Sequence, residues 1–214
     1  MCYNKTIKEK TLKVYIDLGS YIGETIQDAI KKFDDFDMFI GFEPIPELFK
    51  KCVKRFKGNP KVRIHRLGVS DKNEKLKLYL DYFVKEKRFG SGSSTLKSKK
   101  SGRVKKSIRI SRCEKIKCID FSEFIKEQFT KDDYIVIKMN VEGQEYDILE
   151  HMLAEDTVDF INVLYCSWHM NKMKNPQDFE DRQQNIIDSL EKHGFVKTSS
   201  TRLQDIFKSK TGTE

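Results

Sequence analysis

The residues from Val14 to Thr25 read VYIDLGSYIGET and join an apolar run to a loop that contains two glycines. The run from Leu12 to Leu18 has the β-branched, apolar character that predicts a strand. The next segment, Glu24–Phe33, has helical periodicity, and its predicted inner face is Ile26, Ala29, Ile30 and Phe33. The chain therefore begins with a strand, a tight loop and a helix.

The same alternation continues along the chain. Further strands are predicted at residues 37–43, 61–70, 76–83, 108–119, 133–140, 160–169 and 195–200, and helices from Pro46 and at residues 121–129, 144–153 and 178–193, with Gly194 as the stop of the last one. Residues 133–140 form the most β-branched run and predict a central, buried parallel strand. This order predicts an α/β fold, a three-layer sandwich with a mostly parallel central sheet.

In such sheets ligands bind beyond the carboxyl ends of the strands, near the point where the strand order reverses. This rule selects the loops that should build a site. They follow Leu18, Phe42, Val69, Met139 and Trp168.

Length and composition predict one domain, residues 1–214, because 38% of the residues are apolar and 35% are charged. No window approaches the roughly 20 apolar residues of a spanning helix. The first ten residues lack a secretory signal, so we expect a cytoplasmic protein. Five cysteines without a CxxC pair or a histidine cluster predict ordinary thiols. The ending KSKTGTE, residues 208–214, is expected to leave little room for a last hairpin, which leaves open that the chain is part of a longer enzyme.

The net charge of +8 comes from one segment. Lys85–Lys117 contains 13 Lys or Arg and two Glu, whereas the rest of the chain has 28 basic and 31 acidic residues. Residues 85–107 are also rich in Gly and Ser and are predicted to form a mobile insertion. A lid over an acidic acceptor, a solvated loop and a nucleic-acid surface are the alternatives. Phe89 is the one aromatic residue of the cluster, which disfavours base stacking and makes a nucleic-acid partner unlikely.

The first loop reads D-x-G-x-x-x-G from Asp17 to Gly23. Glycines let the backbone turn sharply and let a ligand approach the main chain. A dinucleotide site needs a third glycine, and here Asp17 and Glu24 stand where the phosphate charges would lie. The loop therefore disfavours a dehydrogenase and favours a cofactor with adenosine and a cationic centre, S-adenosylmethionine.

Acids follow the next two strands as well. Glu43 ends the second strand, where a carboxylate can accept hydrogen bonds from both ribose hydroxyls. Ser70 and Asp71 end the third strand and could reach the adenine amino group. The alternatives are a carboxylate at a helix N-terminus before Pro44 and Pro46, and a simple turn residue at Asp71. The combination with the first loop favours the ligand.

Several stretches resemble the FkbM-type S-adenosylmethionine-dependent methyltransferases. They are YIDLGSYIGET, GFEPIPELFK, LGVSDKNEKLKLY, GSGSSTL and IVIKMNVEGQEYDILEHM, and the likeness runs from about Leu12 to about His169. The most specific element is K-x-[DN]-V-E-G-x-E, here Lys138–Glu145. The resemblance implies a class I methyltransferase fold and methyl transfer to a hydroxyl, frequently on a sugar.

The resemblance also implies roles for single residues. The cofactor would contact Asp17, Gly19, Ser20, Tyr21, Gly23, Glu43, Pro44, Ser70 and Asp71. The acceptor would contact Ser93, Ser94 and Trp168. The family usually has an aspartate where this chain has Asn140. An amide cannot act as a base there, although it can orient a substrate oxygen.

Methyl transfer to a hydroxyl requires positioning and the removal of a proton. His169, after the fifth strand, is the first candidate base, with a structural imidazole as the alternative. Glu142 is the second candidate, with a helix-capping role as the alternative. Lys138 lies on a buried strand and is expected to pair with Glu142 or Glu145. A divalent metal held by Glu142 and His169 stays open, although no spacing requires one, and no metal site is predicted.

The sequence thus predicts an S-adenosylmethionine-dependent O-methyltransferase that acts on a carbohydrate hydroxyl in glycan or glycolipid synthesis. The alternative is an RNA-binding or RNA-methylating protein of the same fold, which would use the basic segment at residues 85–117. The sequence leaves the sugar, the hydroxyl position and the oligomeric state undetermined.

Overall fold

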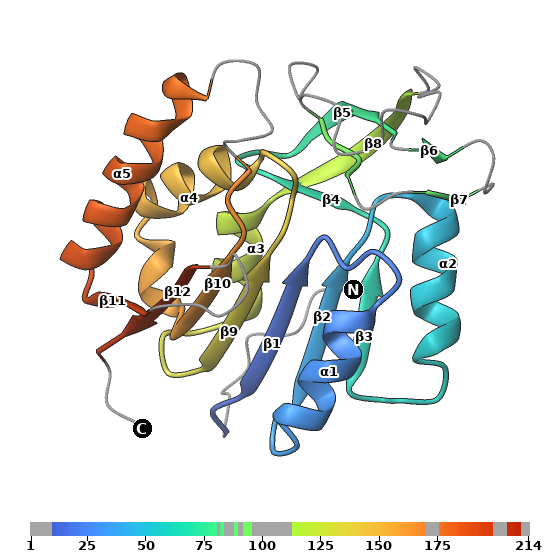
Figure 1. Ribbon diagram of the computed structural model, residues 1–214. Coiled ribbons are helices and arrows are strands. Elements are labelled where there is room, and N and C mark those ends of the chain that lie inside the picture. The colour runs from blue at the N-terminus through green and yellow to red at the C-terminus, as the bar shows by residue number, and fades with distance from the viewer. Residues whose placement is uncertain are drawn as a thin grey trace.

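A seven-stranded sheet with the order β11-β12-β10-β9-β1-β2-β3 forms the centre of the molecule (Figure 1). The computed structural model describes residues 10–80, 82–83, 88–89, 92–95, 113–169, 176–198 and 205–210. The strands are β1 (Lys13–Leu18), β2 (Met38–Phe42), β3 (Val62–His65), β9 (Tyr134–Met139), β10 (Val163–Cys166), β11 (Phe195–Thr198) and β12 (Asp205–Ser209). All neighbours pair in parallel except for the two antiparallel pairings of β12. The predicted mostly parallel sheet is confirmed.

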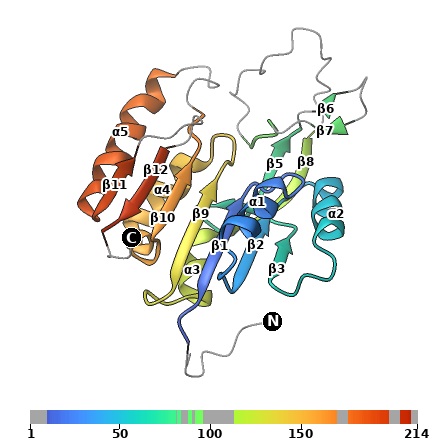
Figure 2. The ribbon, with the colours of Figure 1, turned by 60° about the horizontal axis from the view of Figure 1, so that its bottom comes forward.

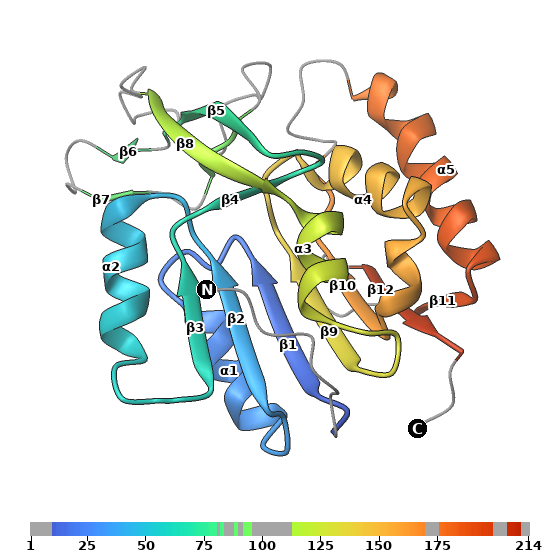
Figure 3. The ribbon, with the colours of Figure 1, turned by 180° about the vertical axis from the view of Figure 1, so that it is seen from behind.

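Helices cover both faces of this sheet, as Figures 1 and 3 show from opposite sides. The helix α1 (Glu24–Lys32) packs on one face through Ile26 and Ala29. Three helices pack on the other face: α3 (Phe121–Gln128), α4 (Glu145–Ala154) and α5 (Gln177–Lys192). The helix α2 (Pro46–Arg55) lies beside β3, and a 3₁₀ turn, η1 (Thr157–Phe160), follows α4. None of the helices in the described part of the chain has the length and apolar character needed to span a bilayer.

The two middle strands are buried on both sides. In β1 and β9 all residues but the first are buried, and Ile16, Ile135 and Ile137 have no exposed surface. Burial of one such side chain contributes about 1.5–3 kcal/mol relative to exposure. These strands therefore form a rigid platform, and the residues that follow them have well-defined positions.

A second, small sheet lies beyond the carboxyl ends of the central strands and beside the start of α2 (Figures 1 and 2). Its order is β4-β8-β5, with β4 (Gly68–Ser70), β8 (Cys113–Asp120) and β5 (Glu74–Tyr79). The prediction of one strand over residues 61–70 was wrong, because the chain leaves the central sheet after β3 and enters the small sheet as β4. Gly68 permits this step: a Cβ there would lie 2.6 Å from Cys118 Sγ on β8.

A hairpin of β11 and β12 closes one edge of the central sheet. The expectation that little room remained for a last hairpin was therefore wrong. Two strands of four and five residues suffice, because Phe207 is completely buried against the core. Two further strands, β6 (Tyr82–Phe83) and β7 (Arg88–Phe89), pair with each other. Most of the predicted insertion at residues 85–107, and residues 108–112 and 199–200, lie outside the described residues.

Candidate functional site

The loop after β1 has the tight geometry that its glycines predict. Gly19 and Gly23 have φ values of 85° and 82°, and Tyr21 between them has 54°. The amides of Gly19 and Ser20 both donate to the Phe42 carbonyl, at 3.1 and 3.0 Å. A Cβ on Gly19 would lie 2.3 Å from the Asn140 carbonyl oxygen, so the loops after β1 and β9 touch through their backbones.

Substitution of Gly19 by alanine should cost more than substitution of Gly58, which has a similar φ of 87° but open space around its Cα. Gly58→Ala adds the left-handed backbone strain of about 1 kcal/mol. Gly19→Ala adds the clash with Asn140 as well, and we expect a total loss of about 2–3 kcal/mol in the free energy of unfolding. Urea unfolding of both variants measures the difference; equal losses would contradict the close contact.

Asp17 and Lys138 form a buried ion pair at the carboxyl ends of β1 and β9. Lys138 Nζ lies 2.9 Å from Asp17 Oδ1 and donates to the Gly19 carbonyl at 3.1 Å. The Thr25 hydroxyl donates to the other Asp17 oxygen. The predicted pairing of Lys138 with Glu142 or Glu145 was wrong. Because Asp17 has its own cation, its charge is no argument against a phosphate. The case against a dinucleotide therefore rests on Glu24, in the first turn of α1, and on the missing third glycine.

Glu43 points its carboxylate at two backbone amides. Its Oε1 accepts from Ile45 N and its Oε2 from Tyr21 N, both at 2.9 Å. The side chain is buried, and this burial raises its pKa to about 7, although the two amide hydrogen bonds favour the charged form. Each oxygen keeps a further lone pair for a ligand.

Glu142, His169 and Glu145 form a buried chain that we call the Glu–His–Glu triad. His169 Nδ1 lies 2.8 Å from Glu145 Oε1, and its Nε2 lies 3.2 Å from Glu142 Oε1. Glu145 has no exposed surface and also accepts from the amides of Gly143 and His169 at 2.7 and 2.9 Å. Burial lowers the pKa of His169, but its two carboxylate partners outweigh that effect and raise the pKa above its ordinary value. The two neighbouring acids thus favour the protonated form of the His169 ring.

A cavity joins these features. It encloses about 710 Å³ of space, part of it open to solvent. Its apolar wall includes Ile45, Leu48, Val69, Leu78, Ile116 and Cys118 from α2 and the small sheet. Its polar lining includes Glu43, Ser93, Thr95, Asn140, Glu142 and Gln144.

The structure brings part of the predicted site to this cavity. Seven of the predicted residues line it: Gly19, Tyr21, Glu43, Pro44, Ser93, Asn140 and Glu142. Four other predicted residues belong to the loop after β1 or stabilise it without lining the cavity: Asp17, Ser20, Gly23 and Lys138. His169 contacts Glu142 and is also not part of the lining.

Four further predicted residues are not part of the cavity lining: Ser70, Asp71, Ser94 and Trp168. The Ser70 hydroxyl lies within hydrogen-bond distance of two carboxylates, 2.9 Å from Asp71 Oδ1 and 3.0 Å from Glu74 Oε1. Ser94 Oγ donates to the Glu142 carbonyl at 2.6 Å and so fixes the loop after β9. Trp168 Nε1 donates to Asp205 on β12 at 2.8 Å.

Sequence reasoning missed two kinds of residue. Thr25, Thr95 and Gln144 were missed as hydrogen-bonding groups, and the D-x₇-T spacing on the first loop was the one available signal for Thr25. The apolar wall was missed because its residues come from segments far apart in the sequence, which meet only where α2 packs on the small sheet. No cluster of three His, Cys, Asp or Glu with metal-binding geometry occurs among the described residues.

Several solved methyltransferase structures are similar to this chain. A solved FkbM methyltransferase from Methylobacillus flagellatus is similar over 92% of this chain, with 13% identity and a TM-score of 0.54. This chain spans 43% of that protein's length. A putative RNA methyltransferase from Pyrococcus horikoshii has 13% identity over 93% of this chain and 76% of its own, with a TM-score of 0.40. A precorrin-6y C5,15-methyltransferase from Geobacter metallireducens has 12% identity over 99% of this chain and 94% of its own, with a TM-score of 0.42. None of the curated protein sequences matches the chain.

The fold is that of the class I methyltransferases, which generally use S-adenosylmethionine. Residues 17–197 match the Methyltransferase FkbM domain, and this match includes the loop after β1, Glu43 and the Glu–His–Glu triad. The chain therefore belongs to the FkbM methyltransferase family.

Proposed function

We propose that the protein is an S-adenosylmethionine-dependent O-methyltransferase that acts on a carbohydrate hydroxyl. The observation that carries this proposal is a cavity with two different buried carboxylates. Glu43 is held by backbone amides, and Glu142 is backed by an imidazole and a second carboxylate. Two acids in different environments suit two tasks, recognition of a ligand and removal of a proton.

The residues of the cavity fit the cofactor. Glu43 retains acceptor positions for ribose hydroxyls, and Gly19, Tyr21 and Pro44 lie beside it. The apolar wall of α2 and the small sheet offers contact to an adenine ring. When bound, S-adenosylmethionine would supply the methyl group on a sulfonium leaving group. Contacts of Ser70 and Asp71 with the adenine remain a prediction.

Ribose hydroxyls would donate to the ionised form of Glu43, so the affinity for the cofactor product should depend on pH. Because the pKa of Glu43 is about 7 in the free protein, the affinity for S-adenosylhomocysteine should rise as the pH increases from 6 to 8 and then level off. Calorimetric titration across this range measures the effect. Glu43→Gln should bind more weakly and lose the pH dependence; an unchanged profile would contradict the role of Glu43.

The other side of the cavity suits a sugar. Amide and hydroxyl side chains form this side. Gln144 Nε2 donates to Thr95 Oγ1 at 2.7 Å, while Gln144 Oε1 is buried and has no hydrogen-bond partner among the residues that the structure describes. A hydroxyl group that donates a hydrogen bond to such a buried oxygen removes the free-energy cost of leaving it unbonded. Asn140 lies on the same side and can orient an acceptor oxygen.

Proton removal falls to Glu142 in this proposal. Two acidic side chains share one imidazole in a buried place, and this arrangement favours the uptake of a proton from the acceptor. Glu142 faces the cavity and takes that proton, whereas His169 and Glu145 position it.

A screen of glycans and nucleotide sugars for transfer of radiolabelled methyl tests the acceptor. We expect label on at least one carbohydrate hydroxyl, with S-adenosylhomocysteine as the second product. If S-adenosylhomocysteine binds in calorimetry but no carbohydrate is labelled, the assignment of the cofactor stands and that of the carbohydrate acceptor is wrong. If S-adenosylhomocysteine does not bind, both assignments are wrong.

A further inference from the structure

The outer face of the small sheet carries four lysines in two facing pairs, which we call the lysine grid. In the antiparallel ladder of β5 and β8, Lys75 is opposite Lys117 and Lys77 is opposite Lys115. All four are exposed. The residues that alternate with the lysines along the two strands point to the other face of the sheet. Three of them, Leu78, Ile116 and Cys118, line the cavity. The sheet therefore has one face toward the cavity and one charged face toward solvent.

The lysine grid destabilises the folded protein when no ligand is bound to it. Directly opposed side chains in such a ladder have Cβ atoms about 4.5–5.5 Å apart, and like charges in these positions destabilise the sheet. None of the four lysines forms an ion pair within the described part of the chain. Of the three acids of these strands, Glu74 and Glu114 alternate with the lysines and lie on the inner face, and Asp120 contacts His151 on α4. An anionic partner would remove this repulsion.

An aromatic residue completes the same face. Tyr79 follows Lys75 and Lys77 at the next outward position of β5, is half-buried and lies opposite Cys113. The sequence argued against nucleic acid because the basic cluster contained one aromatic residue, Phe89. The strand register now places Tyr79, from outside that cluster, in line with lysines from both strands.

We propose that this face binds single-stranded nucleic acid, with backbone phosphates on the lysine grid and a base stacked on Tyr79. Lysines two residues apart on a strand are separated by about 6.8 Å, so neighbouring ammonium groups can contact successive phosphates along one chain. An aromatic ring beside such a row provides the stacking contact of single-strand binders. A bilayer would need apolar anchors, and the exposed large apolar residues of the described chain, Val53 and Val196, lie on α2 and β11.

This surface is independent of the proposed reaction. The lysine grid and the cavity lie on opposite faces of the small sheet, so a nucleic acid on the lysine grid does not enter the cavity. The inference concerns docking of the protein, and its test does not require methyl transfer.

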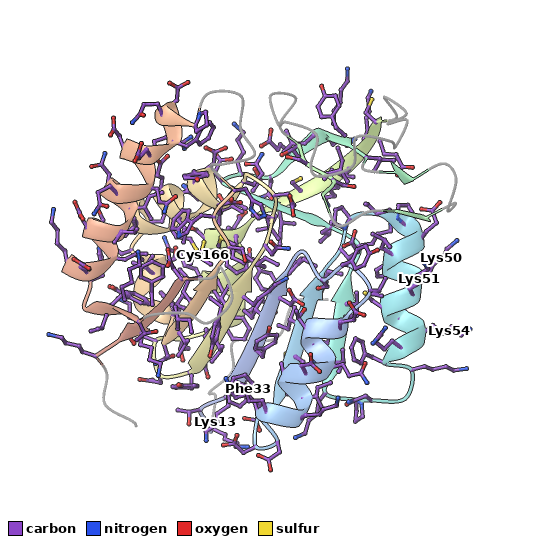
Figure 4. The ribbon with its side chains drawn as sticks, in the orientation of Figure 1. Lys13, Phe33, Lys50, Lys51, Lys54 and Cys166 are labelled. Atoms are coloured by element: carbon purple, nitrogen blue, oxygen red, sulfur yellow. The ribbon has the colours of Figure 1, made fainter. Side chains whose placement is uncertain are left out.

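Fluorescence anisotropy with a labelled oligouridine of about 12 nucleotides tests the proposal. The triple variant Lys75→Gln/Lys77→Gln/Lys115→Gln should weaken binding at least about tenfold and reduce the slope of log affinity against log salt by about 2. The matched control is Lys50→Gln/Lys51→Gln/Lys54→Gln on α2, which removes the same charge from exposed lysines (Figure 4). The control should weaken binding less than about threefold. Equal losses in both variants, or no binding by the wild type at low salt, would overturn the proposal.

The stacking contact has its own test. Tyr79→Leu should weaken oligouridine binding about 5- to 150-fold and leave the salt slope unchanged. Vesicles with anionic lipids and heparin serve as competing polyanions. If either binds as tightly as the oligonucleotide and Tyr79→Leu has no effect, the surface is a general anion site and the nucleic-acid assignment is wrong.

The cost of the lysine grid gives an independent readout on the free protein. Lys77→Glu replaces a repulsive pair by an attractive one and should raise the melting temperature by about 1–3 °C while it weakens oligouridine binding. Lys51→Glu on α2 is the control and should change the melting temperature less. A lower melting temperature for Lys77→Glu would show that the facing lysines do not repel, which contradicts the argument.

Discussion

Lys138→Met should lower the free energy of unfolding by about 3–5 kcal/mol, because it leaves the Asp17 carboxylate buried without its cation. Asp17 has no exposed surface, and the Thr25 hydroxyl cannot neutralise it. Asp17→Asn should cost a similar amount, since it leaves the ammonium of Lys138 unpaired. Urea unfolding measures both changes.

The double variant Asp17→Asn/Lys138→Met gives the decisive comparison. A neutral pair of similar volume should recover most of the lost stability, because desolvation of two charges offsets most of their attraction. The matched control is Lys131→Met, which breaks an exposed pair with Asp159 and should cost less than about 1 kcal/mol. Additive losses in the double variant would contradict a coupled ion pair.

Lys138 also donates to the Gly19 carbonyl, so the double variant separates stability from binding. Recovery of stability without recovery of S-adenosylhomocysteine affinity would identify Lys138 as a residue that positions the loop after β1. Recovery of both would limit its role to compensation of the Asp17 charge.

The sequence was sufficient where local pattern decides the structure. The β-branched run at residues 134–139 predicted the central strand β9, and the glycines at 19 and 23 predicted the tight loop with positive φ. Glu43 was found because it directly follows the apolar strand β2. In these cases a short segment contains its own evidence, so no knowledge of distant contacts is needed.

The errors concern pairings between distant segments. Lys138 meets Asp17 because β1 and β9 align these two residues as register partners across 121 positions of sequence. Glu142 and Glu145 were nearer in sequence, but the pleat and the turn at Glu142, with a φ of 59°, direct them to His169 instead. The lysine grid likewise depends on the register of β5 and β8, and these two strands are far apart in the sequence, since β5 ends at Tyr79 and β8 begins at Cys113.

Glu142→Gln should reduce the rate of methyl transfer about 10²- to 10⁴-fold, because an amide of the same shape cannot accept the proton of the acceptor. The rate is measured on the carbohydrate found by the methyl-transfer screen, and S-adenosylhomocysteine binding should be unchanged. Glu47→Gln, an exposed glutamate in the first turn of α2, is the matched control and should retain full activity. A variant Glu142→Gln with nearly full activity would remove Glu142 as the base.

A second readout is independent of the acceptor. The chain has four histidines, so the imidazole signals can be followed by NMR as the pH changes, and His169→Gln assigns the relevant one. In the wild type His169 should stay protonated above its ordinary pKa, because Glu142 and Glu145 both favour the imidazolium. Glu142→Gln removes one of the two carboxylates, so the ring should lose its proton at a lower pH. If the pKa of His169 were the same in both proteins, Glu142 and His169 would not be coupled, and the triad could not tune a base that faces the cavity.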